Sequence, residues 1–536
     1  MLRQTRLTVV HAALVLFAAA LIARSAWVQL WQGEAWERLA ARQHYAEGAV
    51  PPPRGEILDV SGVPLAQTQV RLRLAVVPRE VREPRLLDRA LQRLGVDRAT
   101  RQRARDKDRK WVPIRGTFLP SEAGALTAMP GVHVEVVGGR EYAPSDGLRK
   151  IVGRVNSTGE GLDGIEAMLD SLLRGERGSV RVRVGARGQR YESPEALTRP
   201  PRPGHSVVLT ISYVLQDICD RALDDAVAQL HAIGGDIVVV DPRSGEVRCL
   251  ASRRSSGVAT GATALIDPFE PGSTLKPLFA AALLEMEKAR LDDVIETFNG
   301  VYVTQGRTIA DVHGAKAMSL ADVIRHSSNV GIVRFTERFT APELYLVLRD
   351  FGFGVPTGVA YPSEAAGVLY EPRRWSPLTP ASLAMGYEVM VTPLQLAMAY
   401  AALANDGVLL SPALVKAVRD ADGEAIYEHQ PMPVRRVVQS STARVLRELL
   451  ASVVDSGTAT DAQVESFLFG GKTGTAKRLV DGRYRSGHYT SSFVGIFPAN
   501  DPQYVVLVKI DEPKGSYYGG TVAAPVARAV VEAAIA

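Results

Sequence analysis

Three short strings in the second half of the chain combine residue types that suit acyl transfer. In the first, Ser273 stands three positions before Lys276. In the second, Ser327 stands two positions before Asn329, and the third begins at Lys472. A serine hydroxyl is a weak nucleophile until a neighbouring base takes its proton, and a lysine amine can be that base when burial or nearby cations lower its pKa. The strings therefore indicate a serine-based acyl-transfer site.

The first string lies where a loop turns into a helix. Pro271 and Gly272 end the loop, and the apolar run 274–284 predicts a helix whose proline lies near the first turn, where a missing backbone donor costs least. Ser273 is then at a helix N-terminus, where free N–H groups and the helix dipole favour negative charge. Residues three apart share a helix face, so the Lys276 amine can approach the Ser273 hydroxyl and act as its base.

The second string is predicted to be a loop between two helices. On a helix, side chains two residues apart point in different directions, whereas in an extended or turn segment both can point to one side. Ser327 would relay a proton, and the Asn329 amide could donate to and accept from a substrate peptide group. The neighbouring His326 is interpreted as a loop residue and not as a catalytic base.

The third string, Lys472 to Thr475, follows an apolar run and predicts a strand. Gly474 allows another backbone to come close, so a peptide substrate could lie alongside as an added strand. Lys472 with the hydroxyls of Thr473 and Thr475 would hold a carboxylate. The N–H groups of Ser273 and Thr475 could form an oxyanion hole. Each string alone also fits an ordinary helix start, turn or strand end, but their shared order and spacing argue against coincidence.

Together the strings resemble a motif set of β-lactamases and penicillin-binding proteins. Residues 206–536 resemble the transpeptidase domain of class B penicillin-binding proteins, most closely the FtsI-type division enzymes, and upstream segments resemble that family's N-terminal pedestal. The asparagine at 329 resembles the division group, since the elongation group more usually has aspartate there. The matching stretches are 270–277, 326–331, 390–397, 471–476 and 517–520 in the catalytic part, and 54–59, 62–66, 140–144 and 161–166 in the pedestal.

The resemblance implies a serine D,D-transpeptidase that cross-links peptidoglycan stem peptides, needs no cofactor and is acylated by β-lactams. Ser273 would attack the penultimate carbonyl of a D-Ala-D-Ala donor, release D-alanine and pass the acyl group to an amine of a neighbouring stem. If water replaced that amine, the same acyl-enzyme would make the protein a D,D-carboxypeptidase. An elongation-type transpeptidase also stays open, as does a different class, a non-enzymatic β-lactam sensor or division scaffold.

The chain departs from the family's pattern at two places. The pedestal motif usually continues with arginine after the aspartate, but Val60 follows Asp59 here, which is expected to alter a local salt bridge. Before residue 390 the family usually reads Gly-Tyr-Gly, whereas this chain has Glu388 in place of the second glycine. The glutamate implies that a positive φ is not needed there or that the loop is rebuilt.

Composition places the chain among globular proteins. Its 536 residues are 46% hydrophobic and 23% charged, and this length allows about two to four domains. The net charge of +5 is interpreted as an arginine-rich solvated surface, with a helical face of ion pairs between Arg89 and Arg115, and no nucleic-acid site is expected. Cys219 and Cys249 are too few for a disulfide framework and are predicted to be buried thiols. The histidines lack metal-ligand spacing, so no metal site is expected.

The N-terminus predicts the compartment. Two arginines within the first six residues precede residues 7–23, a stretch without formal charge that spans about 26 Å as a helix. Trp27 and Trp31 suit the far interface, so the basic start would remain in the cytoplasm and the catalytic part would lie outside the inner membrane. A cleaved signal peptide is the competing interpretation, because residues 18–20 are small.

Three parts are predicted. Residues 1–23 form a cytoplasmic tail and transmembrane anchor, 24–204 a stalk and a β-rich, non-catalytic pedestal of the dimerisation type, and 205–536 the transpeptidase domain. The transpeptidase domain is expected to have an α+β fold of the penicillin-binding and β-lactamase-like type, in which helices pack an antiparallel sheet. Partners implied by the resemblance are peptidoglycan stems, the membrane, a multi-span glycosyltransferase and other division proteins. The strands expected are 235–241, 246–250, 492–497 and 504–510, and a helix is expected over 393–405.

Overall fold

The computed structural model describes residues 2–32, 34, 36, 45–184, 190–191, 197–256 and 261–536. The chain forms two compact units. The first comprises residues 1–53 and 175–204, and the second comprises 54–174 and 205–536.

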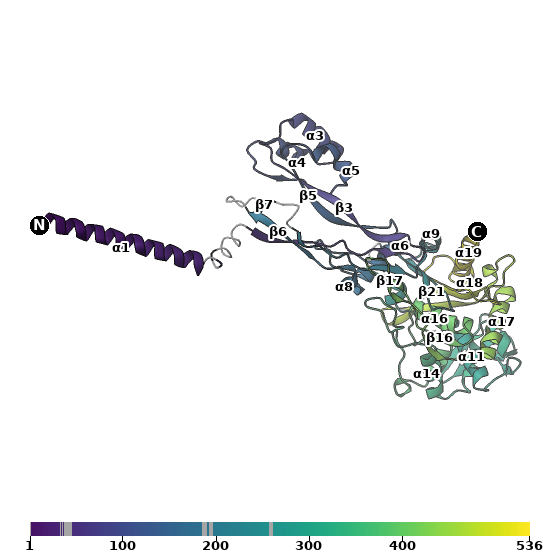
Figure 1. The fold of residues 1–536 in the computed structure, drawn as a ribbon. Helices are drawn as coiled ribbons and strands as arrows, with labels where there is room; N and C mark the ends of the chain where they lie inside the picture. The colour runs from purple at the N-terminus through teal and green to yellow at the C-terminus, as the bar shows by residue number, and fades with distance from the viewer. Residues whose placement is uncertain are drawn as a thin grey trace. The chain divides into compact units, whose positions relative to one another are not determined.

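The first unit consists of one long helix and a small antiparallel sheet (Figure 1). Within the helix, Thr5–Leu30 has a mean hydropathy of 2.1 and is long and apolar enough to cross a membrane. The same properties suit a signal sequence, the alternative raised by the sequence. Residues 33, 35 and 37–44 of the predicted stalk lie outside the described residues. The elements are α1 (Leu2–Leu30), β1 (Tyr45–Val50), β6 (Gly178–Val184), β7 (Arg190–Tyr191) and β8 (Leu197–Arg199), with β6 paired to the other three strands.

The second unit contains a seven-stranded mixed sheet with strands from both the predicted pedestal and the predicted transpeptidase domain. The order is β18-β17-β9-β2-β3-β4, with β5 also paired to β3, and only β2 and β9 pair in parallel. Residues 54–174 and 205–536 therefore share backbone hydrogen bonds, and the domain boundaries predicted at 23 and 204 stay a proposal. The strands are β2 (Ile57–Leu58), β3 (Pro64–Val76), β4 (Val112–Pro113), β5 (Val132–Tyr142), β9 (Ser206–Leu209), β17 (Val415–Arg419) and β18 (Ala425–Glu428).

The predicted ion-paired helices lie at one end of the long β3–β5 ribbon (Figure 1). They cover part of β3 and enclose a small core of their own, in which Leu74, Leu87 and Phe118 are buried. Arg101 on α4 approaches the Asp88 carboxylate on α3 at 3.3 Å, and within the predicted stretch Arg109 approaches Asp106 at 3.6 Å. The helices are α3 (Pro84–Arg93), α4 (Arg98–Arg105), α5 (Pro120–Ala123) and the short 3-10 turn η1 (Gly124–Leu126).

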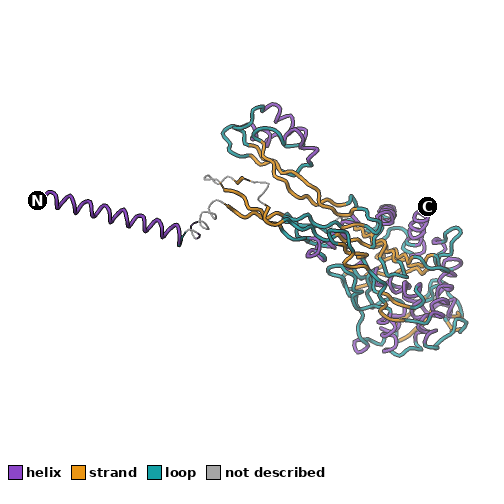
Figure 2. Tube along the Cα trace, in the orientation of Figure 1, coloured by secondary structure: helices purple, strands orange, loops and turns teal. Residues whose placement is uncertain are grey.

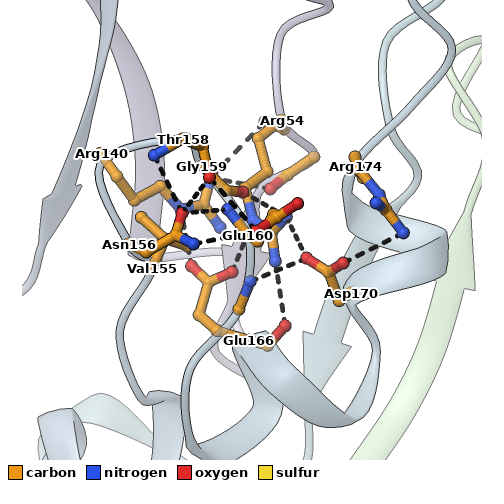
Figure 3. A network of polar contacts seen from close by, with 12 residues as sticks. Arg54, Arg140, Val155, Asn156, Thr158, Gly159, Glu160, Glu166, Asp170 and Arg174 are labelled. Carbon is orange, nitrogen blue, oxygen red and sulfur yellow. Dashed lines mark hydrogen bonds and ion pairs between the residues drawn. The ribbon is translucent and has the colours of Figure 1, made fainter.

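A buried charge cluster joins the family-like pedestal segments (Figure 3). Glu166 has no exposed surface and accepts from the Nε atoms of Arg54 (2.6 Å) and Arg140 (2.7 Å). Asp59, where a change in a salt bridge was expected, is instead buried as a backbone acceptor. It receives the N–H groups of Ser61, Val63 and Tyr213, and so links the pedestal to the first catalytic helix. The nearby helices are α6 (Asp146–Val152), α7 (Gly164–Met168) and α8 (Asp170–Leu173).

A five-stranded antiparallel sheet, in the order β11-β10-β22-β21-β20, forms the centre of the predicted transpeptidase domain. Figure 2 shows helices and strands mixed in this part of the chain. Strand β10 is buried along its whole length, so both faces of the sheet are covered. One group of helices, α9 and α19, packs on the sheet, and a second group consists of α11, α16 and α17. The predicted α+β fold is confirmed. The elements are β10 (Gly234–Val240), β11 (Val247–Arg254), β20 (Gly470–Val480), β21 (Arg483–Phe497), β22 (Tyr504–Asp511), α9 (Tyr213–Gln229), α11 (Lys276–Glu285), α16 (Pro393–Ala404), α17 (Ser440–Ser456) and α19 (Ala524–Ile535).

Shorter elements surround this sheet and carry most of the loops near the site. The short helices are α10 (Thr263–Ile266), η3 (Gly272–Leu275), η4 (Phe298–Gly300), α12 (Leu320–Arg325), α13 (Asn329–Thr336), α14 (Ala341–Asp350), η5 (Pro372–Arg374), α15 (Thr379–Ala384), η6 (Thr460–Ala462) and α18 (Gly519–Val522). The two-stranded pairs are β12 (Val294–Glu296) with β15 (Ala317–Ser319), β13 (Val301–Thr304) with β14 (Arg307–Ala310), and β16 (Val408–Leu410) with β19 (Pro433–Arg436).

Helix α9 carries a buried thiol and a partly buried carboxyl whose environment matters for stability. Cys219 on α9 and Cys249 on β11 are buried free thiols, as the sequence predicts. Asp220 accepts from the Ser145 hydroxyl (2.9 Å) at the start of α6, and Gly147 approaches it so closely that a Cβ there would lie 2.2 Å from a carboxylate oxygen. Burial raises the pKa of Asp220 to about 6.

We expect Asp220→Asn to stabilise the protein at pH 7.5 by about 2 kcal/mol, because the folded protein then no longer ionises a buried carboxyl. The gain should be present above the folded pKa of about 6 and disappear as the pH falls toward the unfolded value of 3.8, where the wild-type carboxyl is protonated in both states. Calorimetry of the full-length protein in detergent at pH 7.5 and pH 4.5 measures the difference.

The matched control is Asp217→Asn, on the same helix, whose side chain is 43% exposed. It should leave the pH dependence of the thermal midpoint unchanged. An Asp220→Asn variant that is no more stable than the wild type at pH 7.5 would contradict the assignment.

Candidate active site

Ser273 stands in η3, one turn of 3-10 helix that leads directly into α11, so the predicted helix start is present. Its side chain is partly buried, whereas Lys276 has no exposed surface. Gly272 takes a φ of +57°, a conformation that favours glycine, and its N–H donates to the carbonyl of Gly386 (3.1 Å). A Cβ at Gly386 would lie 2.0 Å from the Gly272 carbonyl oxygen. The turn that presents Ser273 is therefore held by a loop that can come this close only because residue 386 is glycine.

The Lys276 side chain points into the second string. Its Nζ donates to the Ser327 carbonyl (2.6 Å) and to Asn329 Oδ1 (2.7 Å), and it lies 3.4 Å from Ser327 Oγ. Burial lowers the pKa of Lys276 to about 7, and the negative charge of Asp311 opposes this effect. Among the described residues, no hydrogen bond joins the Lys276 amine to the Ser273 hydroxyl, although the sequence predicts that these two groups approach each other. At this pKa the amine is neutral often enough to accept a proton near pH 7.

Ser327 lies in the predicted loop between α12 and α13 and adopts a φ of +60°. Its Oγ accepts from Lys472 Nζ (3.0 Å) and also lies 3.4 Å from Lys276 Nζ. Asn329 is the first residue of α13. The strained turn at Ser327 lets the Ser327 and Asn329 side chains point to the same place. His326 is exposed at the end of α12, as expected for a loop residue.

Lys472 is fully buried on β20, the predicted strand. Besides Ser327, its Nζ donates to the Thr473 carbonyl (3.1 Å). Burial lowers the pKa of Lys472 well below its ordinary value, and the charge of Lys276 lowers it further. The Thr473 hydroxyl contacts that of Thr458 (2.9 Å), and Thr475 Oγ1 accepts from the Gly519 N–H (3.0 Å). The structure thus brings all three strings together around the Ser327 hydroxyl.

Gly474 has a different role from the one expected. A Cβ there would lie 2.4 Å from Ser492 Oγ and 2.8 Å from the Pro271 carbonyl oxygen. The space is therefore occupied by the chain's own loop before Ser273 and not by a substrate backbone. The glycine lets β20 pack directly against the segment that carries the nucleophile.

The open edge of β20 can be read from the sheet register. Lys477 on β20 lies opposite Tyr489 on β21. The Tyr489 carbonyl accepts the Glu512 N–H (2.8 Å) just after β22, so Tyr489 directs its backbone groups away from β20. The N–H and carbonyl of Lys477 therefore point away from β21, toward the open edge. Thr473 and Thr475 face the same way by alternation. The Thr473 carbonyl is bonded to Lys472, and the Lys477 N–H donates to the Tyr387 hydroxyl (3.2 Å). Thr475 lies between these two capped positions.

Family comparisons match both parts of the chain. Residues 235–532 match the Penicillin binding protein transpeptidase domain, and residues 49–209 match the Penicillin-binding Protein dimerisation domain. The chain belongs to the penicillin-binding proteins. The family predicted from the three strings is therefore confirmed.

Relatives of this penicillin-binding protein cover nearly its whole length. Stage V sporulation protein D of Bacillus subtilis is 32% identical and covers 94% of the chain and 81% of its own length. The probable peptidoglycan D,D-transpeptidase PenA of Neisseria meningitidis is 30% identical over 97% of the chain and 90% of the relative. Peptidoglycan D,D-transpeptidase FtsI of Escherichia coli is 29% identical, over 97% and 89%.

Solved structures agree with the fold. Penicillin binding protein 3 of Mycobacterium tuberculosis, complexed with aztreonam, superposes with a TM-score of 0.71 at 27% identity and covers 90% of this chain and 96% of that one. Penicillin Binding Protein 2X of Streptococcus thermophilus gives a TM-score of 0.78 at 22% identity over 91% of this chain and 80% of that one, and supports the fold alone.

Glu388, which replaces the family's usual glycine in this penicillin-binding protein, keeps the glycine-like backbone. Its φ is +58°, so neither expected alternative holds: positive φ is retained with a side chain present. The Glu388 carboxylate accepts from the Thr379 hydroxyl (2.7 Å), and its N–H donates to Glu270 (2.9 Å). The Tyr484 hydroxyl also donates to Glu270 (2.7 Å). These bonds offset a conformational cost of about 1 kcal/mol.

Two residues near the site were missed by the sequence analysis. Asp311 accepts from the backbone at the start of α13, and Tyr387 caps the edge of β20. Tyr387 lies inside a family-like turn, and its position beside the departure at residue 388 was the available signal. Asp311 belongs to no spacing pattern, because it approaches Asn329 only through the return of the β13–β14 hairpin.

We expect the acylation rate of the full-length protein to rise as the pH increases through about 7 and then to level off. Lys276 must be neutral to take the proton of Ser273, and burial lowers its pKa to about 7. Lys276→Arg should acylate at least about a hundredfold more slowly at pH 8, because arginine keeps its proton. Time courses with a fluorescent penicillin between pH 5 and 9 provide both measurements.

The control is Lys288→Arg, just after α11, which should leave the profile unchanged. Near-normal acylation by Lys276→Arg would rule out the base role.

Proposed function

We propose that this penicillin-binding protein is a serine D,D-transpeptidase that cross-links peptidoglycan stem peptides through an acyl-enzyme on Ser273. The observation that carries the proposal is the pair of buried lysines, Lys276 and Lys472, whose Nζ atoms lie 3.4 and 3.0 Å from the Ser327 hydroxyl, next to the Ser273 turn. The relatives named as peptidoglycan D,D-transpeptidases support the substrate class.

The first half-reaction follows from this arrangement. Neutral Lys276 takes the Ser273 proton as the serine oxygen attacks the penultimate carbonyl of a D-Ala-D-Ala donor. The N–H groups of Ser273 and Thr475 hold the developing oxyanion. When the carbon–nitrogen bond breaks, the proton on Lys276 passes through the Ser327 hydroxyl to the leaving D-alanine amine. An acceptor amine then attacks the ester, gives its proton back along the same relay and releases Ser273.

The edge of β20 sets the donor's direction. Lys472 with the hydroxyls of Thr473 and Thr475 holds the terminal carboxylate, and the Asn329 amide meets the peptide group on the acyl side. Because Tyr387 occupies the Lys477 N–H, the donor backbone pairs with β20 at Thr475 and then leaves the strand. A β-lactam presents its carboxylate and strained amide to the same groups and stays attached as an ester.

Ser273 should be the single residue that penicillin acylates. It is the only serine followed three positions later by lysine in this chain, and it lies at the start of α11. Intact-mass analysis after incubation with penicillin should show one adduct in the wild type and none in Ser273→Ala. Ser327→Ala should still give the adduct on Ser273, more slowly. Peptide mapping of the adduct to Ser327 would overturn the mechanism.

Turnover of a stem-peptide donor separates the two outcomes of the acyl-enzyme. With an acceptor amine present, a transpeptidase forms the cross-linked product, whereas release of the shortened acid alone would assign a D,D-carboxypeptidase. Acylation without turnover of any donor would favour the sensor or scaffold.

We further propose that residues 7–23 anchor the protein in the cytoplasmic membrane with the N-terminus inside and the catalytic part outside. The apolar segment Thr5–Leu30 and the two arginines before residue 7 support this orientation. In the adduct experiment, a membrane-impermeant penicillin should label Ser273 in intact spheroplasts, and the labelled protein should stay in a salt-washed membrane pellet. A labelled soluble form that begins near residue 21 would instead indicate a cleaved signal peptide.

The proposed place of action is the septum, beside a multi-span membrane glycosyltransferase. The likeness to FtsI and the Asn329 of the second string support the division group. Depletion in the native cell should give filaments that elongate without dividing, seen by microscopy. Swollen round cells that still form septa would move the protein to the elongation group, and normal division would contradict a septal role.

A further inference from the structure

Asp311 lies at the junction between the β13–β14 hairpin and the start of α13. One carboxylate oxygen accepts the N–H groups of Asn329 and Val330 (3.0 Å to the latter), and the other accepts the Ser328 hydroxyl (2.6 Å). Ser328 in turn caps α13 by accepting the Gly331 N–H (2.8 Å). A carboxylate from a different element is therefore bonded to both residues that follow Ser327.

The turn that Asp311 binds is strained. Ser327 has a φ of +60°, and a side chain in this region costs about 1 kcal/mol, which the surroundings must offset. The strain is useful, because in this conformation the Ser327 carbonyl faces Lys276 while its hydroxyl faces Lys472. Three hydrogen bonds to one carboxylate can offset such a cost.

The same hairpin also fixes the Asn329 amide. Its Nδ2 donates to the carbonyl of Ala310 (3.0 Å), the residue before Asp311. Oδ1 must then face Lys276, from which it accepts at 2.7 Å. An amide turned the other way would place two donors against an ammonium group, so the hairpin decides which atom of Asn329 the lysine meets.

The charges around Lys276 are few. Asp311 is the negative group that acts on it from the hairpin, and Lys472 on β20 is the positive one. Asp322 and Arg325 on α12 pair with each other at 2.8 Å, and the α12–α13 turn adds only neutral acceptors. Removing the carboxylate would leave the two buried lysines without a negative neighbour among these elements.

We propose that Asp311 is a positioning residue for the reaction: it holds the Ser327–Asn329 turn in its strained form and provides the counter-charge for buried Lys276. This inference rests on the proposed function and adds to it a residue that acts through the turn and not on the substrate. The competing reading is that Asp311 only caps α13, as Asp97 caps α4 by accepting the Thr100 N–H.

The experiment compares Asp311→Asn with Asp311→Glu in the full-length protein in detergent. Asparagine keeps an acceptor for the backbone N–H groups but removes the charge, whereas glutamate keeps the charge and displaces it. The second-order acylation rate with a fluorescent penicillin is measured from pH 5 to 9. For Asp311→Asn the acid limb of the profile should move to lower pH by about one unit, with a plateau about tenfold lower. For Asp311→Glu the plateau should fall while the limb moves by less than about 0.3 unit.

A simple helix cap would lower the plateau in both variants without moving either limb, and that result overturns the inference. An equal movement of the limb in both variants overturns it too. If Asp311→Asn does not fold, the neutral variant Asp311→Ser takes its place, and its limb must move to lower pH by about one unit. Asp97→Asn is the capping control; it should lower the thermal midpoint slightly and leave acylation unchanged. If the wild type is not acylated at any pH, the proposed function fails, which is distinct from failure of this inference.

Discussion

The site depends on keeping two lysine amines out of water beside a single hydroxyl. Neither Lys276 nor Lys472 has exposed surface, and each charge makes the other less favourable. Burial is therefore a way of producing a neutral amine at neutral pH, because the protein disfavours the charged form and the proton is then easily given and taken. Every other element near the site provides acceptors or packing that make this burial tolerable.

Much of that support comes from backbone and not from side chains. Three segments far apart in the sequence meet within hydrogen-bond distance, and where they meet the chain uses positive φ or a missing Cβ, as at Gly272, Gly386 and Gly474. The pedestal contributes as well, because β2 pairs with β9 and the Asp59 carboxylate accepts the N–H at the start of α9. Residues 54–174 are thus part of the same folded unit that positions the catalytic sheet.

The sequence could predict the motifs, the strands and the fold because these follow from local patterns. An apolar run after Ser273, another before Lys472 and helix signals around Ser327 each depend on neighbouring residues, and the predicted helices and strand appear in the structure. The partner of each lysine could not be predicted, because helical spacing places Lys276 near Ser273 while tertiary packing turns its amine to Ser327 and Asn329. Glu388 was misread for a related reason: a preference for glycine is a cost of about 1 kcal/mol that two hydrogen bonds can offset.

The free edge of β20 has a consequence for the cell as well as for chemistry. An enzyme that receives peptides along a strand must leave that strand unpaired, and an unpaired strand is also a template on which copies of the same chain can associate and precipitate. In this protein Lys472 occupies the Thr473 carbonyl at one end and Tyr387 occupies the Lys477 N–H at the other. These two contacts shorten the stretch of edge with which a foreign strand could pair, and so they disfavour association of crowded molecules while leaving Thr475 between them for a short substrate.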